Sequence, residues 1–275
     1  MAALKKIAKK LVPPIAFDVL KSLKPKKTHY GFKGNYSNWE IAAAQCIGWN
    51  SADILEKVSA STLAIKNNTD FFERDGEIIT SKNYNFPVLA SLMRSINQKD
   101  YALNVLDFGG SFGSHYFRFK HFFDPALKLN WSVVEQEHYV VHAKNNFENA
   151  ELNFHTTVND ALQNTKINTF FSSGTIQYLE KPYDFINELI DNAFDFIILD
   201  RIFLIDSETD RIVMQDVNPE LFYEASFPAR LFNETNFINA FLSKYELIAE
   251  FSSEDPDNAI DGIRIYHKGF FLKRI

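Results

Sequence analysis

The chain of 275 residues has a single cysteine, Cys46, and only 10 glycines. One cysteine excludes an intramolecular disulfide and a metal site built from several thiolates. No apolar run approaches the roughly 18 residues that a membrane-spanning helix needs. Lysines interrupt the apolar residues near the N-terminus, so we expect no secretory signal peptide. These absences favour a cytoplasmic protein without a resident metal.

The formal net charge is −6, and it is unevenly distributed. Residues 1–27 hold eight lysines and one aspartate, which gives +7 and leaves −13 for the rest of the chain. An acidic body argues against nucleic acid as the main partner, because neutralising phosphates requires a basic face. The basic segment has an apolar stripe opposite its lysines. We therefore expect it either to contact the anionic inner face of a membrane peripherally or to pack on the protein itself.

Residues 28–100 have the pattern of a helical cap or lid. Ser37 and Glu40 show the spacing of a capping box and predict a helix that ends near Gly48. Two further helices are expected, from Ser51 to about Lys66 and over residues 87–98. The sequence thus divides into a basic amphipathic segment (1–27), a helical cap (28–100) and a main domain (101–275).

Short apolar runs alternate with helical stretches in the main domain. The runs are LNVLDF (103–108), NWSVVEQ (130–136), INTFFSS (167–173) and FDFIILD (194–200). This alternation predicts a parallel sheet with right-handed crossovers. The last two strand-like segments, YELIAEFSS and GIRIYHKGFFLKRI, have no helix between them and predict an antiparallel hairpin. The expected fold class is α/β, with a Rossmann-like, mostly parallel sheet and a helical N-terminal extension.

Three of the glycines fall within five positions of VLDFGGSFGSHYF (105–117), directly after the first predicted strand. In doubly wound sheets this turn is the usual contact for a nucleotide, and glycine lets the backbone pass close to a ligand. A P-loop is excluded because Gly-Lys-Ser/Thr is absent. Counted from Gly109, Ser111 and Ser114 stand where a dinucleotide fingerprint has glycine. An NAD-dependent oxidoreductase therefore remains only an alternative.

Two acidic residues favour a cationic nucleoside ligand. Asp107 precedes the turn, where a carboxylate would repel a pyrophosphate but suit a ligand with an amino group, such as S-adenosylmethionine. Glu135 ends the next predicted strand, where a carboxylate can accept both ribose hydroxyls. The alternative for Glu135 is that it only caps the helix that starts near His138.

Four segments together, VLDFGGSFGSHYF, WSVVEQEHYV, FFSSGTIQYLEKPYDFI and FIILDR, resemble class I S-adenosylmethionine-dependent methyltransferases associated with bacterial surface-polysaccharide gene clusters. The resemblance extends to GNYSNWEIAAAQCIGW, FFERD and EASFPARLF, so it covers nearly the whole chain. It implies that Glu135 and Gln136 hold the adenosine and that Ser172 and Ser173 end the fourth strand beside the cofactor. It assigns the cofactor loop to Asp107, Gly109, Gly110, Ser111 and Gly113.

The sequence departs from this family in two places. Ser111 replaces a glycine that many methyltransferases carry in the loop. The fourth strand ends in Ser-Ser, not in the Asn-Pro-Pro-Tyr-type motif of amino-group methylating enzymes, which favours an oxygen acceptor. The resemblance thus implies O-methylation of a sugar or phosphate-linked group of a bacterial surface glycan or its precursor. The alternative from another class is a non-catalytic cofactor-binding partner in a glycan assembly complex.

Methyl transfer to a hydroxyl requires alignment of the reactants, exclusion of water and removal of a proton. The candidate bases are His115 and Asp200, and the resemblance places Tyr178 near the methyl group. His115 could instead pack or cap a helix, and Asp200 could form an ion pair with Arg201. Alternatively, Arg201 could hold an anionic acceptor. Further candidates for contact with the acceptor, or for helix packing alone, are Tyr36, Trp39 and Arg74.

Overall fold

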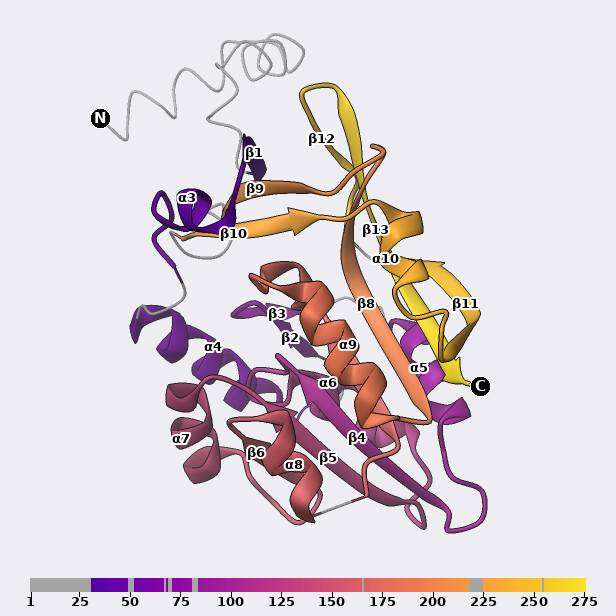
Figure 1. The fold of residues 1–275 in the computed structure, drawn as a ribbon. Coiled ribbons are helices and arrows are strands. Elements are labelled where there is room, and N and C mark those ends of the chain that lie inside the picture. Colours follow the sequence, from indigo (N-terminus) through magenta and orange to yellow (C-terminus); the bar gives the residue numbers. More distant parts are fainter. Residues whose placement is uncertain are drawn as a thin grey trace, which may run out of the picture.

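The computed structural model describes residues 31–48, 52–66, 68, 71–80, 84–164, 166–217, 225–253 and 255–275. The basic segment, residues 1–27, lies outside these ranges. An eight-stranded sheet forms the centre of the molecule, in the order β11–β13–β8–β7–β4–β5–β6 with β12 paired to β13 (Figure 1). Its strands are β4 (Ala102–Phe108), β5 (Lys128–Val134), β6 (Leu152–His155), β7 (Thr169–Ser173), β8 (Phe196–Ile205), β11 (Tyr245–Ser252), β12 (Asn258–Ile260) and β13 (Ile263–Arg274).

The central strands β6, β5, β4, β7 and β8 pair in parallel, whereas β13 is antiparallel to both β8 and β11. The mostly parallel sheet and the antiparallel end are thus confirmed. Strand order reverses on either side of β4, where β5 lies on one side and β7 on the other. In open α/β sheets a ligand crevice forms outside the carboxyl ends of the strands at such a switch point.

Helices cover both faces of the sheet, because strands that are buried on both sides need two apolar layers. On one face, buried side chains of β4, β5 and β7 pack against α4 (Ala52–Ile65), α5 (Phe86–Arg94), α6 (Ser114–Phe119) and α7 (Glu137–Asn146). On the other face the sheet packs against α8 (Val158–Asn164), α9 (Pro182–Asn192) and α10 (Glu234–Asn239). Two short 3₁₀ turns, Lys120–Phe122 and Ile176–Tyr178, follow α6 and β7.

A second, three-stranded sheet lies beside the C-terminal half of β8. It consists of β1 (Gly31–Tyr36), β9 (Arg211–Asp216) and β10 (Ser226–Leu231) in the order β1–β9–β10. Phe203 and Ile205 of β8 share an apolar core with Val213 of β9 and Leu231 of β10. The cap is therefore not an independent helical unit, since its first strand belongs to a sheet completed by residues from the second half of the chain.

The cap departs from the prediction in two further places. The predicted helix up to Gly48 is reduced to α3 (Trp39–Ala43), whose first turn is capped by Asn38 and not by Ser37, since Asn38 Oδ1 accepts the Ile41 amide at 2.9 Å. Strands β2 (Phe72–Arg74) and β3 (Glu77–Ile79) form a hairpin between the second and third of the predicted helices, where the sequence pattern indicated no element. Its two-residue turn, Asp75-Gly76, has φ of 53° and 84°, as Asp-Gly hairpin turns require. The pattern also missed β6 and α8, which are only four and seven residues long.

Candidate functional site

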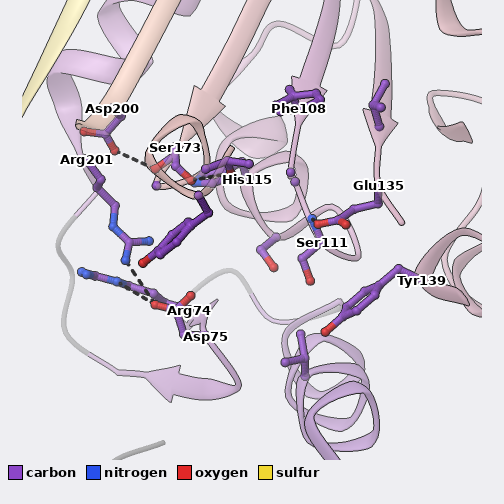
Figure 2. A pocket seen from close by; sticks show the side chains of 18 of the residues that line it. Arg74, Asp75, Phe108, Ser111, His115, Glu135, Tyr139, Ser173, Asp200 and Arg201 are labelled. Atoms are coloured by element: carbon purple, nitrogen blue, oxygen red, sulfur yellow. Dashed lines mark hydrogen bonds and ion pairs between the residues drawn. The ribbon is translucent and has the colours of Figure 1, made fainter. Parts of the chain in front are cut away.

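A pocket of about 440 Å³ opens at the carboxyl ends of β4, β5 and β7 and beside the middle of β8. The turn after β4 and the end of β5 line one side, the end of β7 and the middle of β8 line the other, and the β2–β3 hairpin covers it (Figure 2). Candidate residues from the sequence that line it are Gly109, Gly110, Ser111, His115, Glu135, Gln136, Ser173, Tyr178, Asp200, Arg201 and Arg74. The topological switch point and the pocket thus coincide.

The glycine turn is shaped by left-handed backbone. Gly109 has φ of 73° and Gly113 has φ of 84°. A Cβ at Gly109 would lie 2.2 Å from Thr175 Oγ1, so the turn packs directly against the chain that follows β7. Ser111 also has positive φ, 53°, which explains why glycine is favoured at this place of the loop. Gly113 caps α6 and does not line the pocket.

Asp107 lies beneath the turn and does not line the pocket. Its side chain is fully buried, and its Oδ2 accepts the Trp131 Nε1–H at 3.0 Å. A Cβ on Gly110 would lie 2.5 Å from this carboxyl group, so the glycine permits the close approach. Asp107 is therefore not at the pocket wall, where direct contact with a cationic ligand was expected to place it. The carboxylate instead supports the turn from below.

Glu135 faces the turn from the end of β5 (Figure 2). Its Oε1 accepts the Ser111 amide at 3.3 Å, and its Oε2 accepts the Gln136 amide at 2.9 Å. Burial raises the pKa of this carboxyl group, against the lowering effect of the two amides. Tyr139 of α7 and Thr156 after β6 line the same side of the pocket. These residues form a recess with one carboxylate at its centre.

Ser172 and Ser173 have different surroundings, because neighbouring residues of a strand point to opposite faces of the sheet. Ser172 is buried and donates to the Phe108 carbonyl at 3.0 Å, outside the pocket lining. Ser173 lines the pocket and donates to Asp200 Oδ2 at 3.0 Å. Asp200 also accepts from Asn85 Nδ2 at 3.0 Å and from Ser253 Oγ at 3.1 Å. Three donors from three parts of the chain thus hold this carboxylate.

Asp200 and Arg201 both line the pocket, although a regular strand would direct them to opposite faces. The reason is a break in β8: Arg201 has φ of 57°, and the register with β13 shifts between Lys268 and Phe270. A Cβ at Gly269, opposite the break, would lie 2.9 Å from the Leu199 carbonyl. The irregularity turns the Arg201 guanidinium into the pocket.

Two of the pocket arginines, Arg74 and Arg201, are held by two aspartates. Arg201 Nε donates to Asp255 Oδ2 at 2.8 Å, and Arg201 Nη2 donates to Asp75 Oδ2 at 3.2 Å. Arg74 pairs with the same two aspartates. The predicted alternative of an Asp200–Arg201 ion pair is therefore not what forms. This arginine–aspartate cluster (Arg74, Asp75, Arg201 and Asp255) ties the hairpin to β8 and, through Asp255, to the segment after β11. Figure 2 shows Arg74, Asp75 and Arg201 of this cluster.

His115 and Tyr178 both reach the pocket. His115 Nδ1 lies 3.7 Å from Asp107 Oδ2, and its ring meets Phe171 edge to face. The Tyr178 hydroxyl donates to Gln215 Oε1 of β9, and burial raises the pKa of Tyr178 well above its usual range. Tyr178 is therefore not a base near neutral pH.

Tyr36 and Trp39 do not line the pocket, which corrects their expected contact with an acceptor. Tyr36 belongs to β1 and donates to Gln45 Oε1 at 3.1 Å. Trp39 begins α3, which contacts β9 and β10. Both residues serve the second sheet, which a single sequence could not reveal because β9 and β10 lie about 170 to 190 residues further along the chain.

The sequence analysis missed Glu73, a buried carboxylate of the hairpin that lines the pocket. Its carboxyl oxygens accept the Gly76 amide at 2.7 Å and the Ser114 hydroxyl. Burial raises the pKa of Glu73 to about 7. The available signal was Asp75-Gly76, a hairpin dipeptide that begins two residues after Glu73.

Within the described ranges, no three or more His, Cys, Asp or Glu side chains are grouped to hold a metal ion. No helix in the part of the chain that the structure describes is long and apolar enough to cross a membrane.

No protein-family model and no curated protein matches the chain. Several solved structures are similar. The N-terminal domain of EvdMO1 with SAH bound has a TM-score of 0.48 and 12% identity, over 80% of this chain and 96% of that one. An S-adenosylmethionine-dependent methyltransferase from Clostridium acetobutylicum has a TM-score of 0.45 and 10% identity, over 70% and 90%. The magnesium protoporphyrin IX methyltransferase from Synechocystis with bound SAH has a TM-score of 0.45 and 14% identity, over 69% and 81%. These structures share the mixed α/β fold with this chain.

Proposed function

We propose that this chain is an S-adenosylmethionine-dependent methyltransferase that methylates an oxygen of a sugar or phosphate-linked group. The single observation that carries the proposal is the carboxylate of Glu135, held at the end of β5 opposite the left-handed turn after β4. A carboxylate in this place of a doubly wound sheet suits the two hydroxyls of a ribose. The pocket of about 440 Å³ is of the size that small-molecule sites have.

The residues of the pocket fit the proposed cofactor. Gly109 and Gly110 bring bare backbone to the pocket wall, where Cβ atoms would collide with Thr175 and Asp107. Glu135, with Tyr139 and Thr156 around it, would hold the nucleoside. The bound cofactor would supply an electrophilic methyl group for in-line displacement. The protein must then align an acceptor and take its proton.

The acceptor side is the polar end of the pocket, at β7 and β8. Asp200 and His115 are the two candidate bases there, because Tyr178 is occupied by Gln215 and titrates too high. Asp200 already accepts three hydrogen bonds, so it would have to lose one or more of them to accept a proton from the acceptor. His115 would have to lose fewer. This polar side of the pocket suits a hydroxylated acceptor. The resemblance of the sequence favours a bacterial surface glycan or its precursor as that acceptor.

Calorimetric titration tests the cofactor first. The wild type should bind S-adenosylmethionine and S-adenosylhomocysteine, and Glu135→Ala should lose about 1.5–3 kcal/mol of binding free energy through lost charged hydrogen bonds. NADH is the matched alternative ligand. Binding of NADH without binding of the methyl donor would refute the proposal in favour of an oxidoreductase.

Turnover to S-adenosylhomocysteine with candidate glycan acceptors separates an enzyme from a non-catalytic binding partner. If His115 or Asp200 removes the proton, His115→Gln or Asp200→Asn should lower kcat by roughly 10²–10⁴ with cofactor affinity little changed. Full activity in both variants would remove these two candidates.

A further inference from the structure

The hairpin that covers the pocket brings in a carboxylate that forms no ion pair with any residue that the structure describes. Glu73 is 5% exposed, and it lines the pocket beside the start of α6. The ion pairs among the described residues include none to Glu73, whereas the neighbouring Arg74 and Asp75 are both paired. A buried carboxylate is costly unless it is paired and hydrogen-bonded, and Glu73 has only the hydrogen bonds. Its missing counter-charge is the observation from which this inference starts.

The other acids of the pocket are already engaged. Asp200 accepts three hydrogen bonds, Asp75 binds Arg201, and Asp107 lies beneath the turn out of reach. Glu135 is held by two backbone amides on the nucleoside side. Glu73 is therefore the acid left to meet a positive charge that enters the pocket.

We infer that Glu73 binds the ammonium group of the cofactor's amino-acid arm, so that the cofactor itself holds the β2–β3 hairpin closed. This inference rests on the proposed function and adds a recognition residue to it. An ammonium suits Glu73 better than a sulfonium does, because only the ammonium has N–H donors for the lone pairs that Gly76 and Ser114 leave free.

The same hairpin residues that lie next to Glu73 also hold the β2–β3 hairpin against the body of the protein. The first three of its residues contact the body of the protein: the Phe72 ring receives the Arg118 guanidinium at 3.9 Å, Glu73 meets Ser114, and Arg74 meets Asp255. The turn residue Asp75 adds the contact to Arg201. A ligand group that pairs with Glu73 therefore stabilises the closed hairpin without any new protein contact.

Three nucleosides and two variants test the inference by calorimetry at pH 8. Methylthioadenosine has the same nucleoside but no amino-acid arm, and S-adenosylhomocysteine keeps the ammonium but lacks the sulfonium charge. Glu73→Gln should weaken S-adenosylmethionine and S-adenosylhomocysteine alike, by tenfold or more, and change methylthioadenosine by less than twofold. Glu77→Gln is the matched control, because Glu77 lies on the same hairpin, pairs with Lys57 and does not line the pocket.

A pH series on the wild type gives a second measurement that needs no variant. Affinity for S-adenosylmethionine should rise from pH 6 to pH 8 as Glu73 ionises, affinity for methylthioadenosine should not, and Glu73→Gln should abolish the difference. His115 and Tyr139 are the other titratable groups that face Glu73, and the fixed charges around it are Arg74, Asp75, Arg118 and Lys57. A pH difference that survives in Glu73→Gln would overturn the inference.

The outcomes separate this inference from the proposed function. If the wild type binds all three nucleosides and Glu73→Gln weakens them equally, or weakens none, the inference is wrong and the proposed function stands. Unchanged affinity with lowered turnover would make Glu73 a base and also overturn the inference. If the wild type binds none of the three, both fail.

Discussion

Replacing Glu73 by glutamine should stabilise the ligand-free protein at alkaline pH. Burial raises the pKa of the Glu73 carboxyl group from 4.5 to about 7 in the folded protein. Between these two values the folded state binds a proton that the unfolded state has released, so stability falls as pH rises from about 4.5 to about 7 and levels off above that. A pKa rise of this size corresponds to about 3 kcal/mol at full ionisation.

The expected signature is a difference that grows with pH. At pH 5 Glu73 is neutral when folded and ionises only in the unfolded state, so Glu73→Gln should match the wild type within about 1 kcal/mol because glutamine imitates a neutral carboxyl group. By pH 8.5 the variant should be more stable by about 2–3 kcal/mol. Other carboxylates titrate in both proteins, so their contributions cancel in the difference.

Urea denaturation at pH 5, 6, 7 and 8.5 measures the free energy of unfolding for both proteins. Glu77→Gln, at a half-buried position of the same hairpin where the carboxylate pairs with Lys57, should show no growing difference from the wild type. A wild-type-minus-variant difference that stays flat with pH would refute the reasoning, because it would mean that Glu73 ionises at its ordinary pKa despite burial. A variant that is less stable at pH 8.5 would do the same.

Three further changes have defined outcomes. Gly110→Ala should lower the free energy of unfolding by about 1–3 kcal/mol, because the added Cβ overlaps the buried Asp107 carboxyl group; a value near zero in urea denaturation would contradict this. Asp255→Asn removes a charge shared by two arginines and should speed hydrogen exchange of the β2–β3 amides about tenfold, equivalent to about 1.4 kcal/mol; unchanged exchange would show that the cluster does not hold the hairpin. Deleting residues 1–27 should abolish salt-sensitive sedimentation with anionic vesicles while cofactor binding survives, whereas loss of stability without vesicle binding would make the segment structural.

The central sheet could be predicted from the sequence because its signals are local. Each buried parallel strand is a short apolar run, and the helices between them have their own period, so alternation alone indicates a doubly wound sheet. The proximity of Glu135 to the glycine turn could also be predicted, because residues that end neighbouring parallel strands meet at one edge of the sheet. The short elements β6 and α8 escaped because four and seven residues carry too little periodicity.

The tertiary structure decided which of the predicted residues face the pocket and with which partners. Asp107 is adjacent to the turn in sequence, but the missing side chain of Gly110 lets it lie beneath the backbone. Arg201 pairs with Asp75, 126 residues away, and only because left-handed backbone interrupts β8. Glu73 gains its role from a hairpin folded over α6. Such contacts depend on how distant segments pack and on single backbone torsions, and a local pattern of residues specifies neither.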